Sequence, residues 1–244
     1  MTGSTGSIRS IPSGGLRIAG AIPAYQAAPS VGAVARGALT ILPEVLVVDD
    51  GSTDGTADEA RRTGARLISF PSNRGKGAAL AVAFADLFGR GFDGVITLDA
   101  DGQHLPEEIP KLLPAAEAGG DLVLGVRDHL FGEMGSVRRA SNRLSSKAIS
   151  FAAGQRLNDI QTGFRFYSRR LIETVGFPEA RFEAESAVVV RAARRGFKVV
   201  TVPVHLGFAD GRTTSHYRPL MDSLRIAGAV TRARLEMLGW ARSS

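Results

Sequence analysis

The first half of the chain alternates short apolar segments with segments of helical character, and this alternation constrains the fold more than any other feature. The expected strands are residues 17–22, 44–48, 65–70, 94–98 and 121–125. The expected helices between them are residues 30–39, 54–63, 77–88 and 106–118. Strands that alternate with helices predict an α/β fold, with a mainly parallel central sheet that helices flank on both faces.

The second half of the chain is less regular. Strands are expected at residues 164–167 and 197–205, and helices at residues 137–153 and 183–195. Residues 207–218 are polar and turn-rich and predict a mobile loop. The pattern becomes helical again from Pro219 to Trp240.

Three parts are expected along the chain. Residues 1–15 are small and polar and are interpreted as a disordered tail, since they lack the apolar core of a secretory signal. Residues 16–218 are expected to form one domain, because no internal repeat or linker interrupts them. Residues 219–244 are expected to form a C-terminal helical segment.

The composition is that of an ordinary globular protein, with 44% hydrophobic and 22% charged residues among 244. The chain contains no cysteine, which excludes a disulfide scaffold, a thiolate zinc site and cysteine catalysis. The longest apolar run, residues 78–85, is far shorter than the roughly 20 residues that a membrane-spanning helix needs. The chain is therefore expected in the cytoplasm, or peripherally bound at the cytoplasmic face of a membrane.

The chain is basic, with 30 Lys and Arg against 24 Asp and Glu and a formal net charge of +6. A positive surface favours polyanionic partners such as nucleic acid, anionic lipid and phosphorylated substrates, although the same charge also aids solubility. Three Tyr and one Trp are too few for a base-stacking platform, and the strand ends are acidic. Nucleic acid is therefore not an expected partner.

Two acidic residues, Asp49 and Asp50, follow the apolar strand at residues 44–48. Ligands of α/β sheets bind at the carboxyl ends of the strands, where carboxylates can accept hydrogen bonds from a base or a ribose. Helix capping is the alternative, and it explains Asp54 better than it explains the pair. The pair is therefore interpreted as part of a ligand site.

A second acidic pair, Asp99 and Asp101, lies at the end of the strand at residues 94–98. Separated by one residue, the two side chains point the same way and can hold one hard divalent cation together with diphosphate oxygens and water. A calcium loop of the EF-hand type is excluded, because Pro110 occupies the position of its final Glu. His104 is either a further ligand or a polar residue of the turn.

Residues 73–77 read Asn-Arg-Gly-Lys-Gly and precede a helix. Glycines around a lysine at the start of a helix suit phosphate contact, although neither a Walker A loop nor a GxGxxG motif is present. The alternative is a glycine-rich turn that carries a solvated Lys76.

Several motifs together carry a family resemblance. The first half contributes IPAY (22–25), VVDDGSTDGT (47–56), NRGKGAA (73–79), TLDADGQH (97–104) and DLVLGVR (121–127). The second half contributes DIQTGFR (159–165), FEAE (182–185) and SHYRP (215–219). In this order and spacing, over residues 17–225, they resemble the family 2 glycosyltransferases of the GT-A fold, and more narrowly the dolichol-phosphate and other polyprenyl-phosphate hexosyltransferases.

The resemblance implies an inverting, metal-dependent transfer of a hexose from a GDP- or UDP-hexose to a polyprenyl phosphate, such as dolichyl or undecaprenyl phosphate. It implies that the nucleotide-sugar is bound by Pro23, Tyr25, Asp49, Asp50, Lys76, Asp99 and Asp101. It also implies that Asp99, Asp101 and Gln103 hold Mg²⁺ or Mn²⁺, and that Arg127 faces phosphate. The first strand end departs from the family's IPAYNE, because this chain has Gln26 and Ala27, and the base of the donor stays open.

Two further acidic residues, Glu183 and Glu185, match the family's acidic pair at the start of a helix. The resemblance implies that they contact the sugar, or act as general base if the acceptor is a hydroxyl group. A polyprenyl phosphate acceptor is already an anion and needs no base. The alternative is that both residues only complement the positive end of the helix dipole.

Cationic side chains are expected to bind the acceptor phosphate. The candidates are Arg127, Arg138, Arg139, Arg143, Lys147, Arg165 and Arg212, with His216 beside them. Four of them, at positions 138, 139, 143 and 147, lie near one helical face and are expected to form a cationic wall. For any single one of them, a solvated surface charge is the alternative.

The C-terminal segment has the pattern of a basic amphipathic helix with Trp240 near its end. Such a helix lies on an anionic membrane, or packs on its own domain or on a second subunit. Peripheral membrane contact, a homo-oligomer and a membrane-anchoring partner are therefore all open. Two other functions also stay open, namely transfer to a saccharide or other hydroxyl acceptor and non-catalytic nucleotide-sugar binding, which the intact Asp99 and Asp101 disfavour.

Overall fold

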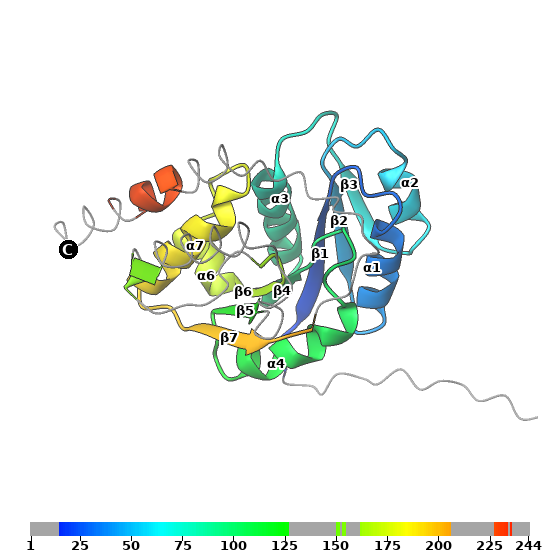
Figure 1. Cartoon of the computed structure of the whole chain (residues 1–244). Helices are drawn as coiled ribbons and strands as arrows, with labels where there is room; N and C mark the ends of the chain where they lie inside the picture. The colour runs from blue at the N-terminus through cyan, green and yellow to red at the C-terminus, as the bar shows by residue number, and fades with distance from the viewer. Residues whose placement is uncertain are drawn as a thin grey trace, which may run out of the picture.

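A computed structural model of the chain describes residues 15–126, 150–151, 153–154, 162–205, 227–233 and 235. Its centre is a seven-stranded sheet with the strand order β3-β2-β1-β4-β6-β5-β7 (Figure 1). The strands are β1 (Ile18–Ala24), β2 (Val45–Asp49), β3 (Arg66–Ser69), β4 (Gly94–Thr97), β5 (Leu122–Val126), β6 (Arg165–Ser168) and β7 (Val199–Pro203). All five strands expected in the first half and both expected in the second half are present.

The sheet is mainly parallel, as predicted, with one exception. Strand β6 runs antiparallel to both of its neighbours, β4 and β5, whereas the other paired strands are parallel. The register pairs Thr97 at the end of β4 with Arg165 at the start of β6. The antiparallel direction therefore brings the residues just before β6 to the carboxyl edge of the sheet.

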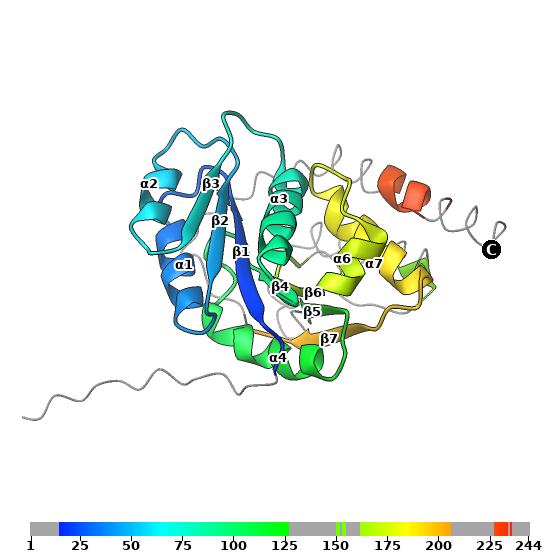
Figure 2. The same ribbon diagram turned by 180° about the vertical axis from the view of Figure 1, so that it is seen from behind.

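Helices cover both faces of the sheet (Figures 1 and 2). They are α1 (Val31–Leu39), α2 (Thr56–Arg61), α3 (Lys76–Gly89), η1 (Pro106–Glu108), α4 (Ile109–Glu117), α6 (Arg169–Val175) and α7 (Glu183–Arg194). Side chains of β1 alternate between two cores, because neighbouring residues of a strand face opposite sides. Ala19 and Ala21 pack with α3, α6 and α7, whereas Ile18 and Ile22 pack with α1 and α4.

Helix α6 was not expected from the sequence, and some expected elements cannot be compared. Residues 1–14 of the tail expected at 1–15, most of the helix expected at 137–153 and the loop expected at 207–218 lie outside the described residues. Of the C-terminal segment, residues 227–233 are helical, and Ala229, Val230 and Ala233 are buried in the same core as α7. This stretch therefore packs on its own domain, while Leu235 remains 60% exposed.

The order of the strands places a topological switch point between β1 and β4, which are neighbours in the sheet. The connection after β1 packs α1 on one face, and the connection before β4 packs α3 on the other. In open α/β sheets, ligands bind outside the carboxyl ends of the strands at such a point. No helix among the described residues is both long and apolar enough to cross a bilayer.

Candidate active site

The loop after β1 is tied to the loop after β2. Gln26 donates its backbone N–H to Ser52 Oγ at 2.9 Å, and its side-chain Oε1 accepts the N–H of Thr53 at 2.9 Å. Gln26 has a positive φ of 51°, a conformation that asparagine adopts more readily than glutamine. Although this chain has Gln26 where the family's IPAYNE motif has Asn, hydrogen bonds to side chains still join the two loops. Beside it, Tyr25 is 37% exposed and Pro23 is partly exposed at the end of β1.

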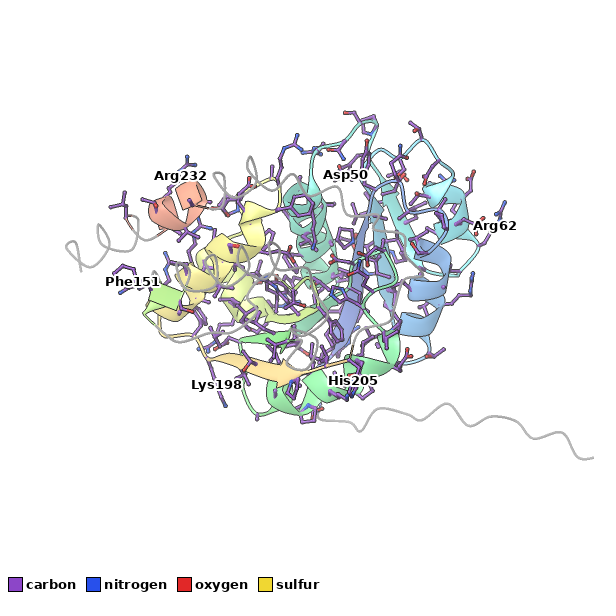
Figure 3. All side chains as sticks on the ribbon, in the orientation of Figure 1. Asp50, Arg62, Phe151, Lys198, His205 and Arg232 are labelled. Carbon is purple, nitrogen blue, oxygen red and sulfur yellow. The ribbon has the colours of Figure 1, made fainter. Side chains whose placement is uncertain are left out.

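Asp49 and Asp50 are both buried at the carboxyl end of β2. Asp50 is labelled in Figure 3. Asp49 Oδ1 accepts the N–H of Ser52 at 3.1 Å. The two oxygens of Asp50 accept the backbone N–H groups of Arg74 at 2.6 Å and Gly75 at 2.8 Å. Burial raises the pKa of Asp50, although these two hydrogen bonds oppose the shift. Asp50 thereby fixes the loop that leads into α3.

The glycines around Lys76 allow the start of α3 to approach residues 179–184 closely. A Cβ atom at Gly77 would lie 2.2 Å from the backbone oxygen of Glu179, and one at Gly75 would lie 2.4 Å from that of Ala180. The N–H of Ala78 donates to the same Ala180 oxygen at 2.9 Å. These contacts account for the glycines by packing, and phosphate contact stays a prediction.

Lys76 is not a solvated turn residue, because it bridges two carboxylates. Its Nζ lies 2.6 Å from Asp99 Oδ1 and 2.8 Å from Glu185 Oε2, and its side chain is 13% exposed. We call this set of contacts the Lys76 bridge. Burial lowers the pKa of Lys76, but the two carboxylates more than offset this and raise it. Burial raises the pKa of Asp99, because it also disfavours the charged form of a carboxyl group. The attraction of Lys76 outweighs burial and lowers the pKa of Asp99 from 3.8 to about 2.

The surroundings of Asp99 fix its orientation. A Cβ atom at Gly163 would lie 2.4 Å from Asp99 Oδ2, so only glycine fits there. The N–H of Asp99 donates to Nδ1 of His104 at 3.1 Å, which assigns the ring proton to Nε2. His104 is buried and stacks on Phe164 with ring centroids 5.6 Å apart. Of the two roles considered for His104, these contacts favour that of a turn residue, which orients Asp99. They do not favour the role of a metal ligand.

Asp101 is partly exposed, and Oδ1 accepts the N–H of Gln103 at 3.0 Å. The loop between the two aspartates is held by Ser30 Oγ, which donates to the oxygen of Ala100 at 2.6 Å. Among the described residues, no group of three or more His, Cys, Asp or Glu side chains is arranged to hold a metal ion. Two carboxylates still fit Mg²⁺ or Mn²⁺ as hard oxygen donors, provided that substrate oxygens and water complete the shell.

Arg165 requires a correction, because it was predicted to contact the acceptor phosphate. Its side chain is fully buried. Nε donates to the oxygen of Thr162 at 2.6 Å, and Nη1 donates to the oxygen of Glu185 at 2.5 Å. These hydrogen bonds give Arg165 a structural role, which is to join the start of β6 to the start of α7. No sign of this role is visible in the sequence, because the partners of Arg165 are backbone oxygens.

Glu183 and Glu185 lie in the first turn of α7, as predicted. Glu183 Oε2 and Glu185 Oε1 are both buried, and neither atom has a hydrogen-bond partner among the described residues. Arg165 Nε lies 3.9 Å from Glu185 Oε1. The first turn of α7 therefore presents carboxylate oxygens that remain able to accept further hydrogen bonds.

The other predicted cations cannot be placed. Arg127, Arg138, Arg139, Arg143, Lys147, Arg212 and His216 lie outside the described residues. The structure does bring together Lys76, Asp99 and Glu185, which are far apart in the sequence. The sequence did not predict the pairing of Lys76 with Glu185, and the only signal for Gly163 was its place in the DIQTGFR motif.

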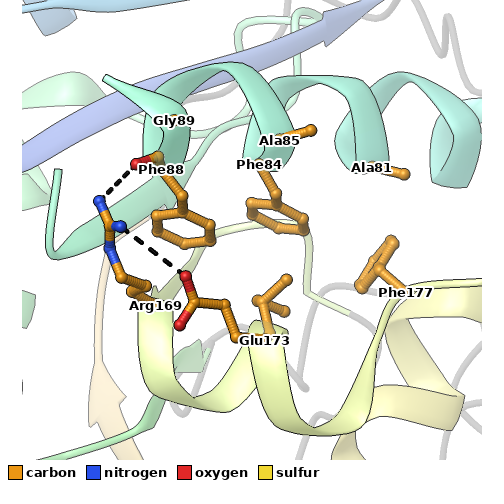
Figure 4. A pocket seen from close by; sticks show the side chains of 9 residues that line it. Ala81, Phe84, Ala85, Phe88, Gly89, Arg169, Glu173 and Phe177 are labelled. Carbon is orange, nitrogen blue, oxygen red and sulfur yellow. Dashed lines mark hydrogen bonds and ion pairs between the residues drawn. The ribbon is translucent and has the colours of Figure 1, made fainter. Parts of the chain in front are cut away.

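A separate cavity of about 350 Å³ lies between α3 and α6 (Figure 4). Phe84, Phe88 and Phe177 line it. Arg169 lies at one end, where it donates to the oxygen of Phe88 and pairs with Glu173 at 3.7 Å. None of its lining residues belongs to the predicted site, so the cavity is not the candidate active site.

Comparison with known proteins agrees with the motifs. Residues 21–176 match the family model described as glycosyl transferase family 2. The chain is 34% identical over 175 residues to polyprenol monophosphomannose synthase of Mycolicibacterium smegmatis, and this match covers 66% of the chain and 65% of that protein. It is 30% identical over 243 residues to undecaprenyl-phosphate mannosyltransferase of Micrococcus luteus, covering 92% of the chain and 94% of that protein. The chain thus spans slightly less than two thirds of the first relative.

A solved structure with a similar fold is glucosyl-3-phosphoglycerate synthase from Mycobacterium tuberculosis, in complex with Mn²⁺, uridine diphosphate and glucosyl-3-phosphoglycerate. The TM-score is 0.68 at 20% identity, with 92% of this chain and 81% of that chain covered. This likeness concerns the fold, and it confirms the predicted GT-A architecture. The family match, the two relatives and the strand-end motifs agree, and the chain belongs to glycosyl transferase family 2.

Proposed function

We propose that the chain is an inverting transferase that moves a hexose from a GDP- or UDP-hexose to a polyprenyl phosphate. The observation that carries the proposal is the Lys76 bridge, which gathers Asp99 and Glu185 at the switch point of the sheet. The names of the two relatives support a polyprenyl phosphate acceptor and a mannosyl donor. The chain's own sugar and base are left to experiment.

In this proposal, Asp99 and Asp101 would hold Mg²⁺ or Mn²⁺ with help from Gln103. The bound cation would supply Lewis acidity that offsets the diphosphate charge of the leaving nucleotide. Pro23, Tyr25, Asp49 and Asp50 line the nucleotide pocket. For Asp50 this contact is indirect, because both of its oxygens already accept backbone N–H groups.

The acceptor side uses cations and needs no base. A polyprenyl phosphate is an anion at neutral pH, so its oxygen can attack the sugar without losing a proton. Arg127, Arg138, Arg139, Arg212 and His216 are proposed to hold that phosphate. Glu183 and Glu185 are proposed to face the sugar, since each has a buried oxygen that can still accept a hydrogen bond. A lipid acceptor supports the further proposal that the protein binds peripherally at the cytoplasmic face of a membrane.

A hydroxyl acceptor is the second candidate, and the buried Oε2 of Glu183 supports it. A sugar hydroxyl must lose its proton as it attacks, so a carboxylate at this place would act as general base. Glu183→Gln would then abolish turnover. With a polyprenyl phosphate acceptor, the same variant would weaken sugar binding and leave most of the turnover rate.

A donor panel tests the proposal. GDP- and UDP-hexoses are compared by the shift that each causes in the melting temperature, with and without Mn²⁺, because a ligand stabilises the state that it binds. One nucleotide series should raise the melting temperature of the wild type in the presence of Mn²⁺, and Asp101→Asn should abolish the rise. If no nucleotide-sugar shifts the wild type, the donor site is wrongly assigned.

A further inference from the structure

We propose that Lys76 competes with the divalent cation for Asp99, so that the cation and the nucleotide bind to this site cooperatively. The inference rests on the proposed function, because it concerns the same donor site. It adds a role for Lys76 beyond contact with the nucleotide, namely a built-in counter-ion that occupies the site until the substrate arrives.

The first support is the way Asp99 is shared. Its Oδ1 contacts Lys76 Nζ at 2.6 Å, and its side chain is 30% exposed, whereas the side chain of Lys76 is 13% exposed. A ligand from solvent can therefore reach the carboxylate of Asp99 while the ammonium approaches it from the interior. A cation bound at Asp99 would stand close to that ammonium, and the two like charges would repel each other.

The second support is that the backbone of Lys76 is held firmly on both sides. On one side, Asp50 holds the N–H groups of Arg74 and Gly75. On the other side, Gly77 packs against the oxygen of Glu179. Glu179 is itself fixed by a buried ion pair with Arg191, with N–O distances of 2.5 and 2.9 Å. Relief of the repulsion must therefore come from the flexible side chain of Lys76 rather than from movement of α3.

The third support is the second partner of Lys76. When the ammonium leaves Asp99, Glu185 Oε2 at 2.8 Å still neutralises it. A donor diphosphate beside Asp99 would offer the Lys76 ammonium a new anionic partner in place of Asp99. The cation alone brings no such anion, so it should bind weakly without nucleotide. By linkage, the cation and the nucleotide then strengthen each other's binding by the same factor.

Titration of Mn²⁺, followed by electron paramagnetic resonance of the free ion, tests the inference with and without GDP or UDP. Lys76→Met should raise the affinity for Mn²⁺ without nucleotide by about tenfold or more, as expected when one close charge pair is removed. The nucleotide should then strengthen Mn²⁺ binding much less than it does in the wild type. Lys198→Met is the matched control, because this exposed lysine bonds to the oxygen of Ala118, outside the site.

Glu185→Gln gives the opposite sign and keeps the test decisive if Lys76→Met folds poorly. Without Glu185, an ammonium that leaves Asp99 has no remaining anion, so the affinity for Mn²⁺ without nucleotide should fall several-fold. Circular dichroism checks that each variant is folded. Unchanged Mn²⁺ affinity in Lys76→Met and Glu185→Gln, with binding still lost in Asp101→Asn, would overturn this inference and leave the proposed function standing. No Mn²⁺ binding by any of the proteins, with or without nucleotide, would overturn both.

Discussion

Asp99 is the residue on which the contacts of the site converge. Lys76, His104 and Gly163 approach it from three different segments of the chain. The sequence could identify Asp99 and Asp101, because a strand followed by Asp-x-Asp is a local pattern. It could not identify the Lys76 bridge, because the partners lie far apart in the chain and only the fold joins them.

Asp50 was predicted to bind the nucleotide, and the structure shows that its two carboxylate oxygens accept backbone N–H groups of the protein itself. In Asp50→Asn, an amide N–H₂ would face one of the backbone N–H groups of Arg74 and Gly75 that the carboxylate now accepts. The variant should lose about 1–3 kcal/mol of unfolding free energy in urea denaturation, the cost of an unsatisfied buried donor. Asp58→Asn, which removes an exposed carboxylate paired with Arg61, is the control. Equal stability of the two variants would contradict the structural role of Asp50.

At the scale of elements, the close approach of α3 to residues 179–184 positions Lys76. Gly77→Ala would place a Cβ atom 2.2 Å from the oxygen of Glu179, whereas Gly89→Ala, in the same helix, would place one in open space. Gly77→Ala should therefore destabilise the protein by about 1–3 kcal/mol through overpacking. Gly89→Ala should stabilise it by up to about 1 kcal/mol through helix propensity. Chemical denaturation of the two variants measures both effects, and a stabilising Gly77→Ala would refute the packing argument.

Glu108, the last residue of η1, links helix α4 to the segment that follows strand β7. Its Oε2 accepts hydrogen bonds from Lys111 Nζ at 2.6 Å and from the N–H of His205 at 2.9 Å. Burial raises the pKa of Glu108, but these hydrogen bonds outweigh it and hold the pKa below its usual 4.5. A lowered pKa in the folded state means that the contribution to stability is present above pH 4.5 and is lost as the pH falls through the folded-state pKa.

Melting temperatures measured from pH 7 downward test this link. Glu108→Gln should melt below the wild type at pH 7, because the amide forms weaker hydrogen bonds with these donors. The two melting curves should converge as the pH falls below 4.5, where Glu108 takes up a proton. A difference between the two proteins that stays constant over that range would show that the charge of Glu108 does not contribute.

The elements themselves were mostly predictable from the sequence, within a few residues at each end. Periodic apolar segments such as those of β2 and α3 carry their own signal. Neither the direction of β6 nor the existence of α6 was predicted. The direction of β6 carries no such signal, because a short strand does not show in its own sequence whether its neighbours run parallel or antiparallel to it. The burial of Arg165 could not be predicted either, because its partners are the backbone oxygens of Thr162 and Glu185, and backbone atoms leave no signal in a sequence.

At the scale of the whole molecule, peripheral binding to a membrane is a proposal that the exposed side chains can test. The helical residues 227–233 bury Ala229, Val230 and Ala233 in the domain. Deletion of the C-terminal segment should therefore damage the fold and would not test membrane binding alone. Exposed side chains are the better test. Leu235 is 60% and Phe151 73% exposed, and Phe151 lies at the same end of the molecule as Arg232 (Figure 3).

Leu235→Ser should lower binding to vesicles that contain anionic lipid several-fold, because an exposed leucine beside cationic residues adds interfacial affinity. Co-sedimentation with such vesicles measures it. Leu16→Ser is the control, since Leu16 is also exposed, at 36%, and precedes β1. An equal loss of binding in both variants, or no loss in either, would remove this end of the molecule from the membrane proposal.

The most direct test of the central claim is transfer of a radiolabelled hexose from its GDP or UDP donor to a polyprenyl phosphate, followed by extraction into organic solvent. The wild type should form a labelled lipid in the presence of Mn²⁺ or Mg²⁺ and lose that activity in excess EDTA. Asp101→Asn should keep the fold by circular dichroism and lose activity by about 100-fold or more, since even partners outside the metal's direct ligands are worth about 10–100-fold. Undiminished transfer by Asp101→Asn, or by the wild type in excess EDTA, would contradict the account.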